Sequence, residues 1–158
     1  MRIYLIGMPG SGKSTLGKEL SKKLGYDFID MDSYISKEAG MFIDEIFEAY
    51  GEKFFRDLET NTLKELLNVD NCVIATGGGI VLNRKHKKLM DGKKIYLDVS
   101  LLDLHKRVID SLIDRPLLEK KTLNELYLER KELYESFADI RVDNSDMEKA
   151  ISHIIESL

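Results

Sequence analysis

The chain has 158 residues, of which 43% are hydrophobic, and its 24 basic and 28 acidic residues give a formal net charge of −4. This length and composition suit one folded domain that buries roughly 70% of its unfolded surface and argue against intrinsic disorder. The acidic balance argues against a nucleic-acid-binding protein. There is no apolar run of the ~20 residues that a membrane span needs, and we do not expect the first residues to act as a signal peptide, because their apolar stretch is short. The single Cys72 suits a reducing compartment, so we expect a cytoplasmic protein.

Hydrophobic spacing and turn residues predict strands that alternate with helices along the chain. The predicted strands are residues 2–6, 26–30, 73–76, 94–99 and 140–142. The predicted helices are residues 13–24, the segment 33–67 in pieces broken near Gly40 and Gly51, and residues 81–90, 101–109, 123–137 and 147–158. Strands joined by helical crossovers pair in parallel, so the pattern indicates a single α/β domain, residues 1–158.

A phosphate-binding loop follows the first predicted strand. The run from Gly7 to Ser14, GMPGSGKS, fits G-x-x-x-x-G-K-[ST] between a strand and a helix. Its glycines let backbone N–H groups turn toward phosphate oxygens, and the helix N-terminus adds positive potential. We expect Lys13 to reach the β- and γ-phosphates and the Ser14 hydroxyl to bind Mg²⁺. The alternative, a chance glycine-rich turn, fits the strand and helix context poorly.

Two carboxylates, Asp30 and Asp32, stand at the end of the second predicted strand. Strand alternation puts residues i and i+2 on the same side, so we expect both carboxylates to face one cavity, at the edge where open α/β sheets bind ligands. One could then hold a metal-bound water and the other could accept a proton. The alternative is that one of them caps the following helix.

Three consecutive glycines, Gly77 to Gly79, follow the third predicted strand. They would allow a ligand to approach the backbone closely at the same sheet edge. A flexible turn into the next helix is the alternative for this run alone. Together with the other two strand ends, it suggests that three loops converge on one pocket.

Two arginines depart from the hydrophobic pattern. Arg130 lies on the apolar stripe of the helix predicted at 123–137 and should point inward, where it needs an anion. Arg56 has Glu59 three residues on as a helical partner. The alternatives are a structural buried ion pair for Arg130 and an ordinary surface position for Arg56. The charged stretch from 107 to 121 could be a lid over a nucleotide or a solvated loop.

The motifs GMPGSGKST, DMD, FFRDLE, ATGGGIVL, RPLL and ERKELYESFAD, in this order, resemble the shikimate kinases over nearly the whole chain. The resemblance implies a three-layer P-loop fold of the nucleoside-monophosphate-kinase type with a five-stranded parallel sheet. It also implies phosphorylation of the shikimate 3-hydroxyl on the route to chorismate and the aromatic amino acids, with ATP as co-substrate and Mg²⁺ as cofactor. A substrate-binding helical segment at about 33–61 and a lid at about 107–123 would complete the domain.

The resemblance also implies roles for individual residues. The implied ATP-binding residues are Gly10, Ser11, Gly12, Lys13, Ser14, Thr15 and Arg115, and the implied metal site is Ser14 with Asp30 as its partner. The implied substrate-binding residues are Asp32, Arg56, Gly78 and Arg130, with Phe47 and Phe55 as an apolar wall and Glu59 orienting Arg56. Lys13, Asp32 and Arg115 would be catalytic, with Asp32 as the base. Family members often carry an adenine-stacking arginine at the position of Val108, whereas here Arg107 lies one residue earlier.

Two other functions compete with this interpretation. A gluconate-type kinase would share the phosphate loop, but it gives no reason for the triple glycine or for two carboxylate-seeking arginines. A GTP-dependent switch protein would need D-x-x-G and N-K-x-D motifs, which the sequence lacks. The expected partners are therefore the small molecules shikimate and ATP, without nucleic acid or membrane, and the expected state is a monomer.

Overall fold

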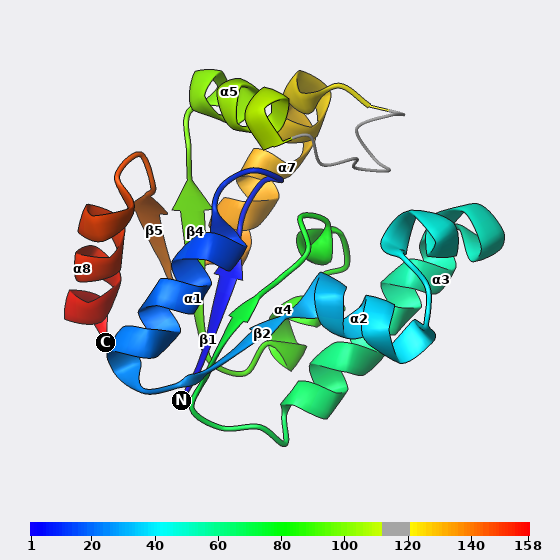
Figure 1. Ribbon diagram of the computed structural model, residues 1–158, viewed down its shortest axis with the longest axis horizontal. Helices are drawn as coiled ribbons and strands as arrows, with labels where there is room; N and C mark the ends of the chain where they lie inside the picture. Colours follow the sequence, from blue (N-terminus) through cyan, green and yellow to red (C-terminus); the bar gives the residue numbers. More distant parts are fainter. Residues whose placement is uncertain (112–120) are drawn as a thin grey trace.

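A five-stranded parallel sheet with the strand order β2-β3-β1-β4-β5 forms the centre of the protein (Figure 1). The computed structural model describes residues 1–111 and 121–158, the side chains of 108–111 excepted. The strands are β1 (Arg2–Ile6), β2 (Asp27–Asp30), β3 (Cys72–Ala75), β4 (Lys93–Asp98) and β5 (Ile140–Asp143). β3 is buried at every position, as expected for an apolar strand that is covered on both faces. The predicted α/β class and five-stranded parallel sheet are confirmed.

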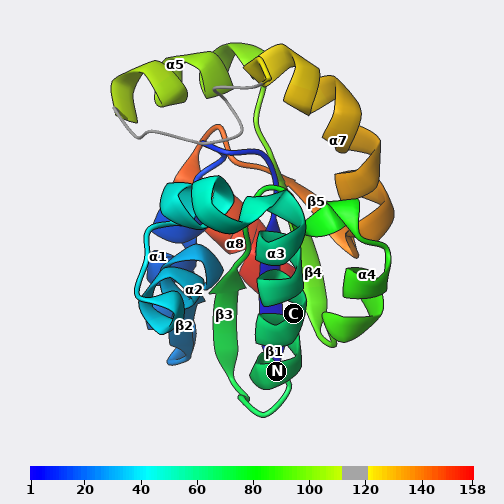
Figure 2. The ribbon, with the colours of Figure 1, turned by 90° about the vertical axis from the view of Figure 1, so that its right-hand side faces the viewer.

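Helices cover both faces of this sheet. They are α1 (Lys13–Leu24), α2 (Met31–Ala39), α3 (Ile43–Leu66), α4 (Lys85–Leu89), α5 (Leu101–Ser111), α7 (Leu123–Phe137) and α8 (Met147–Ser157), with the 3₁₀ helix η1 (Ile80–Leu82). Ile3 and Leu5 of β1 join a core with α1 and α8, whereas Tyr4 and Ile6 face the core shared with α3 and α7. Figure 2 shows α3 in front of the sheet on this second side, with most of its length running along β1. The period-2 alternation of β1 therefore supplies both cores of a three-layer structure.

Two helical predictions need correction. The segment 81–90 is not one helix: it divides into η1 and α4, because the extended backbone of Asn83 (φ −108°, ψ 113°) separates them and its side chain accepts from the amide of Lys85. The helix predicted to begin at 33 begins at Met31 instead. The break predicted near Gly51 is present inside α3 as a left-handed residue (φ 86°) that redirects the helix.

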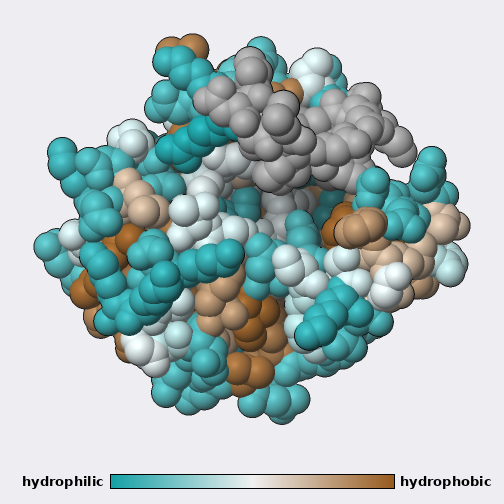
Figure 3. All heavy atoms as spheres, in the orientation of Figure 1, coloured by the Kyte–Doolittle hydropathy of each residue, from teal (hydrophilic) through white to brown (hydrophobic). Residues whose placement is uncertain are grey.

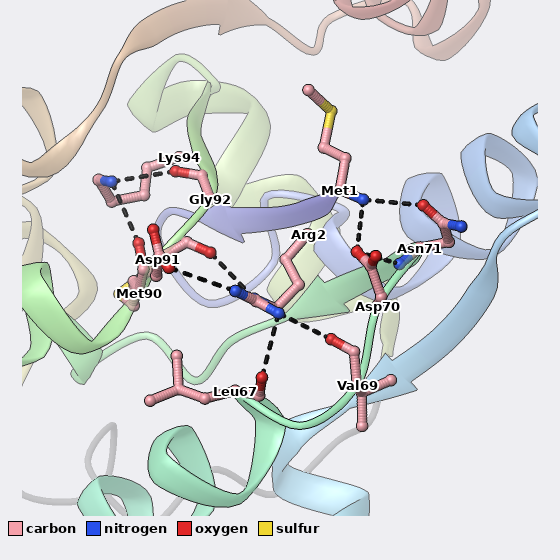
Figure 4. Close-up of polar contacts among 10 residues, drawn as sticks. All are labelled: Met1, Arg2, Leu67, Val69, Asp70, Asn71, Met90, Asp91, Gly92 and Lys94. Atoms are coloured by element: carbon pink, nitrogen blue, oxygen red, sulfur yellow. Dashed lines mark hydrogen bonds and ion pairs between the residues drawn. The ribbon is translucent and has the colours of Figure 1, made fainter.

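Arg2 ties together the loops at the amino end of the sheet (Figure 4). Its guanidinium donates to the carbonyl oxygens of Leu67 (3.2 Å) and Val69 (2.9 Å) after α3, and to that of Asp91 (2.9 Å) after α4. The carbonyls at a helix C-terminus lack partners within the helix, so a cation there is favourable. The Arg2 side chain therefore holds the loops after α3 and α4 together at this end of the sheet. No helix in the described ranges is both long and apolar enough to cross a membrane.

Candidate functional site

A cavity of about 470 Å³ opens at the carboxyl end of the sheet, beyond β1, β2 and β3. Figure 3 shows that this face of the molecule is hollowed near its centre. The lining residues are Gly10, Gly12, Lys13, Ser14, Thr15, Asp30, Asp32, Thr76, Gly77, Gly78, Arg107, Asn144 and Met147. The three strand-end motifs of the sequence therefore converge on one pocket, at the edge where open α/β sheets bind ligands.

The phosphate loop is built as the motif predicts. Lys13 is buried, and its Nζ donates to the carbonyl oxygens of Gly7 (2.7 Å) and Met8 (2.9 Å). Gly12 has φ +91° and precedes the first turn of α1, so the N-terminal end of this helix faces the cavity. A loop of this shape presents backbone N–H groups and a helix N-terminus to an anion.

Asp30 holds two groups at once. Its carboxylate accepts the Ser14 hydroxyl hydrogen and the backbone amide of Ser33 (3.1 Å), which makes it the N-cap of α2. Asp32 therefore lies in the first turn of α2 and not on the strand, so the expected strand alternation is wrong. Both carboxylates nevertheless line the cavity, because the helix begins directly at the strand end.

A hydroxyl and a carboxylate side by side, Ser14 and Asp30, form an all-oxygen set of the kind Mg²⁺ prefers. Within residues 1–107 and 121–158 no cluster of three His, Cys, Asp or Glu side chains could hold a metal by itself. Mg²⁺ commonly takes one or two protein ligands and completes its shell with nucleotide phosphates and water. The residues present fit that cation.

The triple glycine makes room for the charged side chains of the site itself. A Cβ on Gly77 would lie 2.9 Å from Oδ1 of Asp32 and 3.0 Å from Oε2 of Glu59. A Cβ on Gly79 would lie only 2.3 Å from Nη2 of Arg56. Two carboxylates and a guanidinium therefore occupy the space beside Gly77 and Gly79. Gly77 and Gly78 also line the cavity, and the approach of a ligand to this loop stays a prediction.

Arg56 is held in a fixed orientation on α3. Its Nη1 donates to Oε1 of Glu59 at 2.7 Å, and its Nη2 lies 3.4 Å from Glu52. The guanidinium carbon lies 5.3 Å from the centroid of the Phe55 ring. The Phe55 ring packs against that of Phe47, with 4.9 Å between the ring centroids. Its side chain is 14% exposed, so the simple surface interpretation is wrong.

Glu59 is fully buried, with Oε1 on Arg56 and Oε2 beside Gly77. Desolvation raises the pKa of the Glu59 carboxyl to about 7, an effect that Arg56 opposes and Asp32 reinforces. Carboxyls with a raised pKa are common at functional sites, and Glu59 lies between Arg56 and the cavity-lining Gly77.

Arg130 points into the protein, as its place on the apolar stripe of α7 predicts. It is 2% exposed, and among the described residues its Nε and Nη1 have no hydrogen-bond partner. Its Nη1 lies 3.4 Å from where a Gly78 Cβ would be, and Tyr134, one turn on, donates to the Gly78 carbonyl at 2.5 Å. No carboxylate in the described part of the chain forms an ion pair with it, which leaves the alternative of a structural ion pair without support. A buried cation with unused donors is suited to an incoming anion.

Other expected residues are placed less directly. Phe47 and Phe55 pack together beside Arg56. Like Arg56 and Arg130, they are not among the residues that line the cavity, and Ser11 is buried. Arg115, and most of the lid expected at 107–123, lie outside the described residues.

The sequence predicts no side-chain role for Asn144. Its side-chain Nδ2 donates to the backbone carbonyl of Ser11 at 2.7 Å. The backbone carbonyl of Asn144 accepts from Nη2 of Arg107, whose Nη1 donates to the backbone carbonyl of Gly10 at 3.3 Å. These bonds join the loop after β5 and helix α5 to the phosphate loop. The position of Asn144, a polar residue directly after the last strand, was the feature of the sequence that could have indicated this role. Arg107 thus reaches the cavity although it is offset by one position from the family pattern.

Comparison with known proteins agrees with this geometry. The family model for shikimate kinase matches residues 9–158. A shikimate kinase from Sulfurihydrogenibium sp. (strain YO3AOP1) is 41% identical over 160 residues, covering 99% of this chain and 94% of its own. The shikimate kinase structure from Aquifex aeolicus is 39% identical with a TM-score of 0.86, covering 99% of this chain and 95% of its own. The Acinetobacter baumannii enzyme in complex with shikimate is 29% identical with a TM-score of 0.87, covering 99% and 91%.

Proposed function

Because the chain belongs to the shikimate kinase family, we propose that it transfers the γ-phosphoryl group of ATP to the 3-hydroxyl of shikimate. The observation that carries the proposal is the pair of guanidinium groups placed against neighbouring glycines, Arg130 at Gly78 and Arg56 at Gly79. Shikimate carries one carboxylate, and the planar fork of an arginine suits a carboxylate better than a point charge does.

The nucleotide half of the reaction falls on the phosphate loop. ATP phosphates would lie against the backbone from Gly10 to Thr15, with Lys13 beside the transferred group and Arg115 as a second cation from the lid. Ser14 and Asp30 would hold Mg²⁺, which supplies charge neutralisation on the phosphate oxygens. The oxygen-rich contact between these two side chains supports this assignment.

The acceptor half falls on the triple-glycine loop. Arg56 and Arg130 bind the substrate carboxylate, Phe47 and Phe55 lie behind Arg56, and Gly78 contributes backbone to the same surface. The substrate hydroxyl then faces Asp32, which lines the cavity between the acceptor and nucleotide sides. A substrate fixed at one end by two cations is oriented for reaction at the other.

Asp32 is the proposed general base. It takes the proton of the 3-hydroxyl as that oxygen forms its bond to the γ-phosphorus, and the bond to the β,γ-bridging oxygen breaks to release ADP. Lys13 stabilises the negative charge on the transferred group. The segments 33–61 and 107–123 would act as acceptor-binding and lid parts of one domain.

A substrate comparison tests this function. ADP release is measured with shikimate, gluconate and a nucleoside monophosphate offered separately at the same ATP and Mg²⁺ concentrations, with Asp32→Asn as the matched inactive control. We expect turnover with shikimate alone, a 3-phosphate product by phosphorus NMR, and a large loss of kcat in the control. Comparable turnover of gluconate would overturn the assignment of the acceptor.

A further inference from the structure

His86 on α4 is a fully buried titratable side chain that the proposed reaction does not use. Both ring nitrogens are within hydrogen-bond distance of a partner: Nδ1 lies 2.7 Å from the Ile80 carbonyl and Nε2 lies 2.7 Å from Oγ1 of Thr60. A carbonyl oxygen only accepts, so Nδ1 carries the hydrogen in that bond. Burial lowers the pKa of His86, so the ring is neutral and Nε2 accepts from the Thr60 hydroxyl.

These two bonds connect the parts of the structure that hold Arg56. Thr60 stands one helical turn after Arg56 on α3. Since its one hydroxyl hydrogen is donated to His86, the link from Thr60 to Arg56 runs through the backbone of this helix. Ile80 directly follows Gly79, against which the Arg56 guanidinium rests. The contacts therefore close a ring from Arg56 through Thr60, His86 and Ile80 to Gly79 and back to Arg56.

The ring determines where the Arg56 guanidinium lies. The backbone of Arg56 is fixed in α3, and its guanidinium group lies against the glycine loop. The distance between α3 and this loop therefore sets the position of the guanidinium nitrogens. In this ring, His86 makes the side-chain bridge between helix and loop. A catalytic group displaced by about 1 Å loses much of its effect, which makes such spacing important.

We propose that His86 is a positioning residue for Arg56, holding α3 and the triple-glycine loop at the separation that aims the guanidinium at the substrate carboxylate. The inference rests on the proposed function. His86 takes no chemical step, because it is not among the residues that line the cavity. An ordinary core histidine predicts a loss of stability without a preference between the two substrates.

The first test separates the two substrates. His86→Leu fills the space without hydrogen bonds, and Thr60→Val removes the other end of the Nε2 bond with little change in shape. We expect each to raise KM for shikimate, the first by at least about tenfold, and to leave KM for ATP within about twofold of the starting enzyme. His153→Gln, an exposed histidine on α8, serves as the matched control and should change neither constant.

The second test is a double-mutant cycle with Arg56→Ala, read as kcat/KM for shikimate. If His86 acts through Arg56, His86→Leu should lower kcat/KM in the starting enzyme but change it less than about twofold when Arg56 is already absent. Equal losses in both backgrounds, or equal rises in KM for shikimate and ATP, would overturn the inference and leave the proposed function intact. Absence of shikimate turnover in the unmodified protein would overturn both.

Discussion

The guanidinium of Arg56 lies in the space that the missing side chain of Gly79 leaves open, with Nη2 2.3 Å and Cζ 2.6 Å from where a Cβ would be. The neighbouring Gly77 has the same relationship with the carboxylates of Asp32 and Glu59. The triple glycine is therefore the surface on which the proposed base and the proposed substrate-binding arginines are assembled.

Gly79→Ala is expected to weaken shikimate binding selectively. The backbone of Gly79 (φ −98°, ψ 10°) accepts alanine, and the atoms in the way are the end of a flexible side chain, so the fold should tolerate the change. The Arg56 guanidinium must move, which should raise KM for shikimate about tenfold or more, since bonds to charged groups contribute roughly 1.5–3 kcal/mol. Steady-state kinetics with each substrate varied checks this, and an unchanged KM for shikimate would contradict it.

Glu59→Gln should change how stability depends on pH. Burial raises the pKa of the Glu59 carboxyl from its ordinary 4.5 to about 7, so the folded state holds this proton more tightly than the unfolded state. The resulting stabilisation is full below pH 4.5 and is lost as the pH rises through 7. Glutamine carries no such proton. The free energy of unfolding of the variant, measured with denaturant, should therefore rise relative to that of the unmodified protein between pH 5 and pH 8. A difference in the free energy of unfolding that does not change with pH would contradict the shifted pKa.

Lys13→Met should abolish most turnover with the fold retained. The ammonium group donates hydrogen bonds to two carbonyls of the phosphate loop beside the cavity. Its proposed role is to stabilise negative charge on the transferred phosphoryl group. Removing such a group commonly costs about 10²-fold or more in kcat. Single-turnover assays with circular dichroism as the folding control measure this, and a near-normal kcat would remove Lys13 from the mechanism.

Arg2→Ala should lower stability without affecting catalysis. Its bonds to three backbone carbonyls join the loops after α3 and α4 at the amino end of the sheet (Figure 4), and Arg2 is not among the residues that line the cavity. We expect a loss of about 2 kcal/mol in the free energy of unfolding, with both KM values unchanged. Arg84→Ala, at an exposed position, is the matched control. A change in kinetics at normal stability would show that the two ends of the sheet are coupled.

Local pattern was enough to predict the sheet, most helices and the phosphate loop, because each depends on residues close together in sequence. The inward direction of Arg130 also followed from the helical period. The segment 81–90 was mispredicted, since its apolar spacing carries no sign of the extended residue Asn83 that divides it.

The internal arrangement of the site depended on distances that no pattern contains. The strand end at Asp30 was predicted, and capping of the next helix was one of the two roles left open for Asp30 and Asp32; only the bond from the Ser33 amide identifies Asp30 as the cap. Likewise, a run of three glycines does not reveal whether a ligand or a neighbouring side chain fills the space beside it. The sequence predicts no role for His86, because both of its hydrogen-bond partners, Thr60 and Ile80, lie on other elements.

The central claim is that Arg130 is kept buried and incompletely paired for a substrate carboxylate, and KM for shikimate in Arg130→Lys at saturating ATP tests it most directly. A lysine keeps the charge but loses the planar fork. We predict a rise in KM for shikimate of at least about tenfold, an unchanged KM for ATP, and a melting temperature close to that of the unmodified protein, because an incompletely paired buried cation does not stabilise the empty enzyme. An unchanged KM for shikimate together with a large fall in melting temperature would contradict the claim and identify Arg130 as part of the structural core.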